Sequence, residues 1–324
     1  MNRKKYNIAV VGATGLIGRK FIEVLEKRNF PVNSPRFFAS ERSANKKIRA
    51  FGKDYVVETL ENLDARGIDF AFFSAGKKVS LKYAPAFAKA GATVIDNSSA
   101  FRNFPDIPLI IPEINGAQIS NANGIIANPN CSTIIALTPL KNILKKYGLK
   151  KIIFSSYQAV SGSGMKGIRD LLLTRHGFSP EFYDYDISET CIPVIGELSE
   201  GGYTEEERKM INETKKITGL DVAVSATCVR VPIENCHGIS VEVETEKPVV
   251  AALLASEMEY SSALFSPIPV ASEADGKDEV VFGRIRKSNV FENGFSYFAV
   301  GDNTLKGAAL NAVQIAESII KNRS

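Results

Sequence analysis

Cys131 is the most reactive side chain in the stretch of this chain that most strongly suggests chemistry, the sequence Asn-Pro-Asn-Cys-Ser-Thr at positions 128–133. An apolar run at 124–127 precedes this stretch and a helical pattern starts at Thr133, which predicts a strand-to-helix turn. Unpaired backbone N–H groups and the positive end of a helix dipole favour the nucleophilic thiolate there. The alternative is a buried cysteine that packs as a small hydrophobic side chain.

The chain has only two histidines that could move a proton, His176 and His237. His176 lies in Thr-Arg-His-Gly, a pattern typical of a helix C-terminus, where an imidazolium suits the helix dipole. His237 follows a segment that contains Arg230, and it is the candidate for acid/base catalysis, with a purely hydrogen-bonded histidine as the alternative. Cys228, Cys236 and His237 could suggest a metal, but no CxxC or HxxxH pair supports one, so no metal is predicted.

A glycine-rich turn near the start of the chain indicates a dinucleotide site. The apolar run 7–11 is typical of a strand buried on both faces, and Gly-Ala-Thr-Gly-Leu-Ile-Gly at 12–18 joins it to an amphipathic helical pattern. The spacing is GxxGxxG and differs from the commoner GxGxxG. Such a turn lets backbone amides approach a pyrophosphate at the helix N-terminus. A plain tight turn is the alternative.

The loop after the second predicted strand (36–39) bears on the choice of cofactor. It reads Ser-Glu-Arg-Ser at 40–43. A carboxylate such as Glu41 suits the ribose hydroxyls of NAD, whereas Arg42 suits the 2′-phosphate of NADP. Because Lys46 and Lys47 follow closely, the sequence favours NADP. The alternative is an exposed charged loop.

The pattern of predicted elements changes near residue 150. Before it, apolar strands alternate with helices and end in small or polar residues, as at 74–76 and 97–102, which predicts an α/β domain with a doubly wound, Rossmann-like parallel sheet. After it, longer strands with fewer helices predict an α+β domain with a mixed or antiparallel sheet. We expect a dinucleotide-binding domain at 1–129 with 303–324, and a catalytic and dimerisation domain at 130–302.

Bulk composition limits the possible partners. The 324 residues are 44% hydrophobic and 23% charged, which is typical of a soluble globular protein. The net charge of +4 comes without a basic block, so neither a nucleic acid nor a membrane is an expected partner. No apolar run reaches the length of a membrane span. Four cysteines without framework spacing predict reduced thiols and a cytoplasmic location.

A set of motifs in a fixed order makes the chain resemble the aspartate-semialdehyde dehydrogenase family over nearly its whole length. They are the glycine turn and the segments 40–43, 97–102, 128–133, 158–164 and 230–237, with 302–303 and 306–309 near the C-terminus. The resemblance implies an NADP-dependent oxidoreductase that reductively dephosphorylates 4-aspartyl phosphate to aspartate 4-semialdehyde through a cysteine thioester. It also implies inorganic phosphate as co-substrate, a homodimer or homotetramer, and a place in lysine (diaminopimelate), methionine and threonine biosynthesis.

The resemblance further implies roles for individual residues. Cys131 would be the nucleophile and His237 the acid/base. The residues expected to bind substrate or phosphate are Arg102, Asn130, Gln158, Glu206, Lys209 and Arg230. Among these, Gln158 would orient the substrate and Arg230 would bind its α-carboxylate. The residues expected to bind the cofactor are Gly12, Thr14, Gly15, Leu16, Ile17, Arg42, Ser43, Ser74, Ala75, Gly76, Ser161, Gly162 and Asn311.

The chain departs from the family pattern in two places. Cys236 and Gly238 flank the histidine where the family usually has a small residue and a serine. The segment 188–193 lacks an asparagine that is expected near Thr190. Both departures lie near the predicted site, so they bear on turnover rate and substrate range.

Two other functions compete with this prediction. N-acetyl-γ-glutamyl-phosphate reductase performs the same chemistry on a longer substrate, but that family usually has glycine, cysteine and an aromatic residue where this chain has Asn-Cys-Ser at 130–132. A non-enzymatic, cofactor-sensing Rossmann protein would keep the glycine turn without needing Cys131, Arg230 and His237 together.

Overall fold

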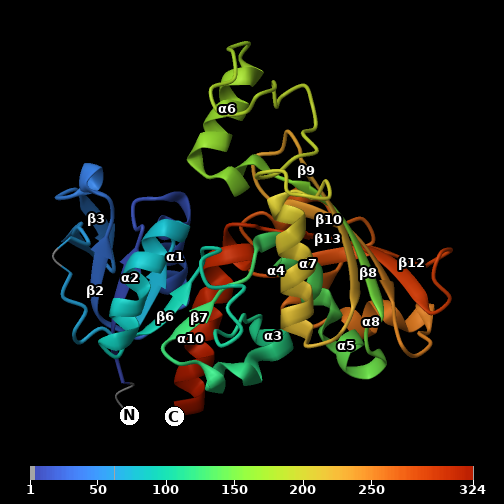
Figure 1. Cartoon of the computed structure of the whole chain (residues 1–324), viewed down its shortest axis with the longest axis horizontal. Coiled ribbons are helices and arrows are strands. Elements are labelled where there is room, and N and C mark those ends of the chain that lie inside the picture. The colour runs from blue at the N-terminus through green and yellow to red at the C-terminus, as the bar shows by residue number, and fades with distance from the viewer. Residues whose placement is uncertain (1–3, 62, 324) are drawn as a thin grey trace. The chain divides into compact units, whose positions relative to one another are not determined.

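The structure is a computed structural model, and it describes residues 4–61 and 63–323. The chain divides into two compact units (Figure 1). Unit 1 comprises residues 1–129 and 308–324, and unit 2 comprises residues 130–307. The domain boundaries predicted from the sequence are 129/130 and 302/303, and the two units divide at 129/130 and 307/308. Within the described ranges, no helix is both long and apolar enough to cross a membrane.

Unit 1 is built on a five-stranded parallel sheet in the order β2-β1-β5-β6-β7. Strand β5 is apolar and fully buried, and so is β1 apart from the half-buried Asn7, as the hydrophobic run at 7–11 predicts. The sheet strands are β1 (Tyr6–Val11), β2 (Val32–Phe38), β5 (Phe70–Phe73), β6 (Thr93–Asp96) and β7 (Ile125–Ala127), and a separate antiparallel hairpin is formed by β3 (Lys47–Ala50) and β4 (Lys53–Val56).

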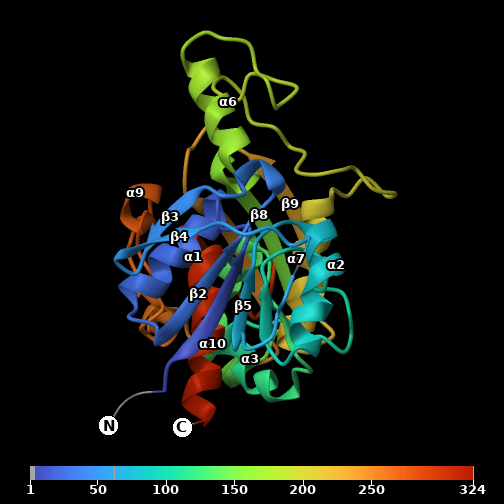
Figure 2. The ribbon, with the colours of Figure 1, turned by 90° about the vertical axis from the view of Figure 1, so that its left-hand side faces the viewer.

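Helices cover both faces of this sheet (Figure 2). The crossover from β1 to β2 and the crossover from β5 to β6 run in opposite directions along the sheet. Because such crossovers are right-handed, their helices lie on opposite faces, and the strand order reverses between β1 and β5. Helix α1 packs beside α10, and α2 packs on the strands from the other side. The helices are α1 (Leu16–Lys27), α2 (Lys77–Lys89), α3 (Pro112–Asn115) and α10 (Leu310–Arg323).

Unit 2 contains a six-stranded mixed sheet in the order β11-β12-β13-β10-β8-β9. The pairs β8/β9 and β11/β12 are parallel and the other pairs are antiparallel. This confirms the predicted fold class. The strands are β8 (Lys151–Gln158), β9 (Ala223–Arg230), β10 (His237–Glu244), β11 (Ala263–Phe265), β12 (Val280–Lys287) and β13 (Gly294–Gly301).

One face of this sheet is covered by helices, of which α4 and α7 pack side by side. Strand β8 shows the consequence, because Phe154 is buried while its neighbours Ile153 and Tyr157 on the other face are 37% and 45% exposed. Helix α6 projects from the sheet in both views (Figures 1 and 2). The helices are α4 (Cys131–Leu137), α5 (Lys141–Tyr147), α6 (Met165–Arg175), α7 (Glu205–Thr218), α8 (Leu254–Met258) and α9 (Ala271–Ala274).

Candidate active site

Helix α4 begins at Cys131, two residues before the predicted start at Thr133. The reason is Asn130, whose extended backbone and side chain form the N-cap. Its Oδ1 accepts the N–H groups of Ser132, at 2.9 Å, and Thr133, at 3.4 Å. Two of the N–H groups that a helix start leaves without partners are thereby satisfied inside the protein.

Asn130 is also fixed by two buried glutamates of α7. Its Nδ2 donates to Glu206 at 2.8 Å, and its backbone N–H donates to Glu213 at 2.7 Å. The two glutamates are seven residues apart and therefore lie on one face of α7. The polar atoms of the Asn130 side chain are thus used to hold the turn that presents Cys131. Its predicted substrate contact stays a proposal.

Cys131 differs from two other cysteines of unit 2 in its environment. It is partly exposed at the first position of α4, whereas Cys228 and Cys236 are buried. Burial raises the pKa of the Cys228 thiol to about 12 and raises the pKa of the Cys236 thiol as well. Both remain thiols at neutral pH, so neither is suited to nucleophilic attack.

Three of the predicted site residues lie on the sheet face that α4 covers. Gln158 and Arg230 end β8 and β9 and are paired in the parallel ladder. His237 begins β10, which runs antiparallel to β8, so it lies at the same end of the sheet. It pairs with Gly301, where an added Cβ would lie 2.9 Å from the Ile135 side chain of α4. The fold of unit 2 therefore gathers these residues on the helix side of one sheet end.

His237 is completely buried. Its Nδ1 accepts the backbone N–H of Ala159 at 3.0 Å, and its Nε2 is buried without a hydrogen-bond partner among the described residues. Burial, together with the positive charge of Arg230, holds the pKa of His237 well below its usual value. The imidazole is therefore neutral at physiological pH.

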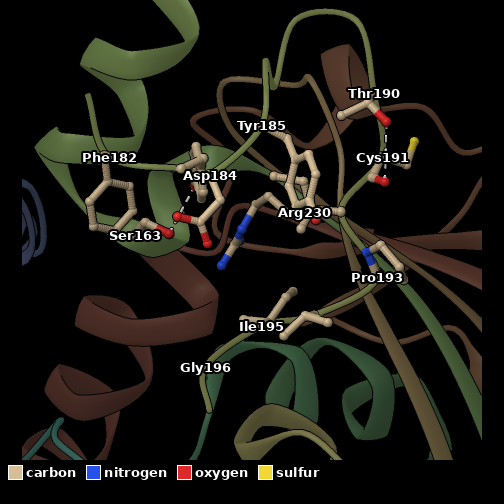
Figure 3. Close-up of a pocket in the computed structure, with 13 residues that line it drawn as sticks. Ser163, Phe182, Asp184, Tyr185, Thr190, Cys191, Pro193, Ile195, Gly196 and Arg230 are labelled. Carbon is tan, nitrogen blue, oxygen red and sulfur yellow. Dashed lines mark hydrogen bonds between the residues drawn. The ribbon is translucent and has the colours of Figure 1, made fainter. Parts of the chain in front are cut away.

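Arg230 is buried, and its Nη1 donates to the Ala159 carbonyl at 2.6 Å. Its Nε has no hydrogen-bond partner in the described part of the chain, and its guanidinium extends into a pocket of about 580 Å³ (Figure 3). Backbone bonds between Arg230 and Ile192 attach the segment around 192 to the open edge of β9. The other lining residues are Ser163, Phe182, Tyr183, Asp184, Tyr185, Thr190, Cys191, Pro193, Val194, Ile195 and Gly196.

The backbone of Gly162 lies close to the side chains of Arg230 and His237. A Cβ on this residue would lie 2.8 Å from Arg230 Nη1 and 3.3 Å from His237 Nε2. The absence of a side chain therefore lets the backbone of Gly162 pack closely against both groups. Gly162 and its neighbour Ser161 belong to unit 2, where Ser161 Oγ donates to Asn235 at 3.0 Å.

Glu206 and Lys209 lie in the first turns of α7. The structure brings Glu206 to Asn130, as described, and Lys209 Nζ lies 3.4 Å from Glu206 and 3.0 Å from Glu205. The helix begins with a capping box between Thr204 and Glu207. Glu207 also accepts the backbone N–H of Cys228, which anchors the start of α7 to β9.

Unit 1 contains a second pocket, of about 700 Å³, at the carboxyl ends of β1, β2 and β5. This is the position where the strand order reverses, which is where ligands bind in open parallel sheets. The predicted cofactor residues that line it are Gly12, Thr14, Gly15, Arg42, Ser74 and Ala75. The lining residues that the sequence interpretation missed include Glu61, Lys82 and Tyr83.

The glycine turn allows two close backbone contacts. Gly12 has φ of +88°, and an added Cβ would lie 2.4 Å from the Ser74 carbonyl oxygen. At Gly18, an added Cβ would lie 2.0 Å from the Gly12 carbonyl oxygen. Helix α1 begins at Leu16 with Gly15 as N-cap and no side-chain cap. Its first N–H groups therefore face the turn without a side-chain acceptor, as a bound diphosphate requires.

The remaining predicted cofactor residues have other surroundings. Ser43 meets Thr14 through hydroxyls 3.4 Å apart, Leu16 and Gly76 lie next to lining residues in the sequence, and Ile17 follows Leu16. Asn311 is fully buried in α10. Its Nδ2 donates to the Ile110 carbonyl at 2.9 Å and to Asn128 Oδ1 at 2.8 Å. These contacts make Asn311 part of the internal packing of unit 1.

Arg102, the predicted phosphate ligand, belongs to unit 1. It is buried, and its Nη2 donates to the Asn97 carbonyl at 2.9 Å. Nearby Asp96 ends β6 and accepts hydrogen bonds from Ser80 and Ser98, while burial raises the pKa of its carboxyl group. In residues 4–61 and 63–323 no cluster of His, Cys, Asp and Glu has the geometry to hold a metal ion.

Several residues of the unit 2 site carry no local sequence signal. Glu213 is one of several charged residues in a helix that mixes acidic, basic and apolar residues, so nothing distinguishes it. Ala159 contributes only its backbone groups. The segment 182–196, which lines the Arg230 pocket, is mostly irregular, so periodicity does not identify it. The one available sequence signal for Glu213 is its helical spacing with Glu206, Met210 and Ile217. These four residues are buried on one face of α7.

Comparisons with known proteins match residues of both units. Residues 7–122 match the family model described as semialdehyde dehydrogenase, NAD binding domain, and residues 140–306 match the model described as semialdehyde dehydrogenase, dimerisation domain. The chain is 44% identical to the aspartate-semialdehyde dehydrogenase of Aquifex aeolicus, covering 98% of both chains. It is 42% identical to that of Bacillus subtilis, covering 97% of both.

Solved structures give the same answer. The structure of aspartate semialdehyde dehydrogenase II from Vibrio cholerae, complexed with ASA, matches with a TM-score of 0.95 and 40% identity. The match covers 99% of this chain and 100% of that one. Sequence and fold thus lead to one conclusion, which confirms the resemblance found in the motifs: the chain belongs to the aspartate-semialdehyde dehydrogenase family.

Proposed function

We propose that this protein is an NADP-dependent aspartate-semialdehyde dehydrogenase, which reversibly converts 4-aspartyl phosphate to aspartate 4-semialdehyde and inorganic phosphate. The observation that carries the proposal is the arrangement in unit 2. A partly exposed cysteine begins α4, and His237, Gln158 and Arg230 lie at one end of the sheet face that this helix covers. The names of the curated relatives support the choice of substrate.

The reaction proceeds through a thioester on Cys131. The thiolate attacks the carbonyl carbon of the acyl phosphate, a C–S bond forms, and phosphate leaves. Hydride addition to the thioester carbon then gives an oxyanion, which expels the thiolate and releases the aldehyde. His237 is proposed as the acid/base at the carbonyl oxygen, because its Nε2 is buried and has no partner in the described residues.

Arg230 is proposed to bind the α-carboxylate of the substrate. Its Nη1 donates to the Ala159 carbonyl, its Nε is buried without a hydrogen-bond partner in the described residues, and its guanidinium reaches into a pocket. A guanidinium can hold a carboxylate through two parallel hydrogen bonds, which fixes both position and angle. Glu206 is proposed to contact the substrate amine, Gln158 to orient the acyl group, and Lys209 to bind phosphate. Arg102 of unit 1 is proposed as a second phosphate ligand.

The residues of the unit 1 pocket fit a dinucleotide. The close approach at Gly12 and the uncapped start of α1 leave backbone N–H groups available for a diphosphate. Exposed Arg42, on the pocket lining, is suited to the 2′-phosphate of NADP. When bound, the reduced nicotinamide supplies the hydride. Ser161 and Gly162 are proposed as further cofactor contacts.

The family also guides the proposal for assembly and cellular role. We propose a homodimer or homotetramer that acts in the cytoplasm, in the biosynthesis of lysine through diaminopimelate, methionine and threonine. The match of residues 140–306 to a dimerisation domain supports an oligomer. So does the exposed face of the unit 2 sheet, which carries the large side chains of Ile153 and Tyr157.

A steady-state assay of the wild type and Arg230→Lys tests the function. The wild type should reduce 4-aspartyl phosphate with NADPH, prefer NADPH to NADH, and show little activity on N-acetylglutamyl phosphate. Lysine keeps the charge but offers only a point contact, so Arg230→Lys should lose about ten- to a hundredfold in kcat/KM, with kcat affected as well as KM.

The alternatives predict different results. Preference for the acetylated, longer substrate would identify an N-acetyl-γ-glutamyl-phosphate reductase. Binding of NADP without turnover of either substrate would contradict an enzyme and favour a cofactor-sensing protein. Equal use of both cofactors would remove the argument from Arg42.

A further inference from the structure

The pocket around Arg230 is built almost entirely from one irregular segment between α6 and α7. All of its lining residues except Ser163 and Arg230 belong to residues 182–196, and in Figure 3 these residues surround the Arg230 side chain. Every residue of this segment is described, and none belongs to a helix or to a strand of the sheets. Such a segment has no ladder of backbone hydrogen bonds, so its position depends on individual anchors.

The first anchor is the side chain of Asp170 on α6, which is 1% exposed. It accepts three consecutive backbone N–H groups. Oδ1 accepts those of Glu181, at 2.5 Å, and Phe182, at 3.1 Å, and Oδ2 accepts that of Tyr183, at 2.9 Å. Successive N–H groups that point at one centre bind an anion, and hydrogen bonds to a carboxylate are the stronger kind. The start of the segment is therefore held against α6.

The side chain of Tyr183 adds a second contact at the same point. Its hydroxyl donates to Ser163 Oγ at 2.9 Å, and Ser163 is one of the two lining residues outside the segment. Gly167 of α6 makes room for this contact, because a Cβ there would lie 2.8 Å from the Tyr183 hydroxyl oxygen. Asp170 and Tyr183 thus fix the same short stretch to two parts of unit 2.

The far part of the segment is attached to the sheet. The backbone of Ile192 donates to the Arg230 carbonyl at 2.9 Å and accepts the Arg230 N–H at 2.8 Å. Its side chain belongs to a buried apolar cluster with Val160, Leu171 and Ile187. Backbone bonds and apolar packing spread this attachment over several residues. The anchor at Asp170 differs, because one side chain carries it and a point substitution can remove it.

We propose that Asp170 is a positioning residue for the reaction: by holding residues 181–183 against α6, it keeps the segment 182–196 in place as the wall of the pocket in which Arg230 binds the substrate. Asp170 does not line the pocket itself, so it acts through the segment. The effect on the substrate rests on the proposed function. The anchor rests on unit 2 alone.

Hydrogen exchange of the full-length protein tests the anchor without an activity assay. Mass spectrometry with fragmentation to single amides should show slow exchange at 181–183. The next N–H groups, of Asp184 and Tyr185, donate to no group in the described part of the chain and should exchange quickly. In Asp170→Ala the amides of 181–183 should exchange at least about tenfold faster, while those of β8 and β10 stay unchanged. Fast exchange at 181–183 in the wild type would overturn the proposal.

Steady-state kinetics tests the consequence for the substrate. In Asp170→Ala the KM for 4-aspartyl phosphate should rise about tenfold, with kcat within about threefold of wild type, because the reacting groups keep their own contacts. Asp170→Asn keeps an oxygen for two of the three N–H groups and turns an amide toward the third, so its KM should lie between those of wild type and Asp170→Ala. A wild-type KM in Asp170→Ala would overturn the proposal. Equal KM values in both variants would also contradict it, since the charge and not the contacts would then matter.

Two further variants serve as controls for folding and for specificity. Tyr183→Phe removes only the hydroxyl, so KM should rise about two- to tenfold. Glu181→Gln changes an exposed side chain that pairs with Arg169 but keeps the backbone N–H, so its KM should equal that of wild type. An increase in Glu181→Gln as large as in Asp170→Ala would contradict the proposal.

Affinity for NADP separates a released wall from a general loss of structure, and it should be the same in all four variants. Should Asp170→Ala fail to fold, Tyr183→Phe decides by itself, and a wild-type KM in that variant would overturn the proposal. A wild type that is inactive on 4-aspartyl phosphate but exchanges slowly at 181–183 would contradict the proposed function and leave the anchor intact.

Discussion

The starts of helices α1 and α4 solve the same physical problem in opposite ways. Helix α1 follows β1 and helix α4 follows β7, which are both strands of the parallel sheet. Both helices begin with N–H groups that have no partner in the helix. At α1 the N-cap is Gly15, which has no side chain to accept them. At α4 the N-cap is Asn130, whose Oδ1 accepts the N–H groups of Ser132 and Thr133.

The difference indicates what each turn is prepared to hold. Around Gly15 no side chain accepts the donors, and we propose that an anion such as a diphosphate accepts them. Around Asn130 the donors are satisfied, and Glu206 and Glu213 hold the capping residue, so the turn is complete in the protein alone. A reactive side chain, Cys131, is thereby presented from a rigid position before any substrate arrives.

The largest expected effect is at the capped turn. Cys131→Ala removes the sulfur proposed to form the covalent bond, and no other group can take over that step, so turnover should fall by at least about 10⁴-fold. The dissociation constant for NADP should not change, because the cofactor does not need the thiol. Steady-state kinetics and a fluorescence titration with NADPH measure the two quantities.

Cys236→Ala is the matched control. Cys236 precedes His237 in the sequence, and its thiol is buried. Because burial raises the pKa of this thiol, removing the thiol should leave most of the activity. If Cys236→Ala abolished turnover and Cys131→Ala did not, the two cysteines would have to exchange roles. The comparison between the two helix starts would then lose its meaning for catalysis.

A smaller effect is expected when the open turn is converted to a capped one. Gly15 has an extended backbone that any residue can adopt, so Gly15→Asn can place an acceptor over the first N–H groups of α1. That acceptor would compete with the diphosphate. Losing a charge-assisted hydrogen bond costs about 1.5–3 kcal/mol, so NADP affinity should fall by roughly tenfold or more.

Gly15→Ala serves as the control for this change. Alanine adds the same Cβ, which lies 3.3 Å from the Gly12 carbonyl oxygen, but it adds no acceptor. Calorimetric titration with NADP should therefore show weaker binding by Gly15→Asn than by Gly15→Ala. Equal affinities would mean that the start of α1 does not bind the diphosphate, and the inferred difference between the two turns would be wrong.

The two turns also show what the sequence could predict. Local signals are sufficient for both: the glycine spacing at 12–18 and the Asn-Cys pair between a strand and a helix. Strands β1 and β7 likewise follow the predicted apolar runs at 7–11 and 124–127, whereas β2 begins at Val32, ahead of the predicted 36–39, because its first residues include the exposed polar Asn33 and Ser34. The start of α4 was placed two residues late, because the cap of Asn130 outweighs the weak helical tendency of Cys131 and Ser132.

The contacts that complete the site were beyond prediction because they join distant segments. Glu213 meets Asn130 across 83 positions, and Ala159 meets His237 across 78, the latter through a backbone group that has no residue signature. The β3–β4 hairpin and the short strand β11 were also missed, since they are short and partly exposed and lack a clear alternation. Register within the sheet, and with it the pairing of Gln158 with Arg230, is likewise a tertiary property.

The smallest expected effect comes from removing the side-chain N-cap of α4 while the other contacts of residue 130 stay the same. Asn130→Ser and Asn130→Ala both lose the amide that donates to Glu206, but serine is as good an N-cap as asparagine and alanine is not. The two variants therefore differ mainly in the cap, which should make Asn130→Ala less stable than Asn130→Ser by about 1 kcal/mol. Urea denaturation measures this difference in stability. The kcat of Asn130→Ala should also be lower than that of Asn130→Ser, because Cys131 is the next residue. NADP affinity should be the same in both variants. Equal stability would show that the glutamates of α7, and not the cap, hold the turn, so the contrast with Gly15 would rest on α7 alone.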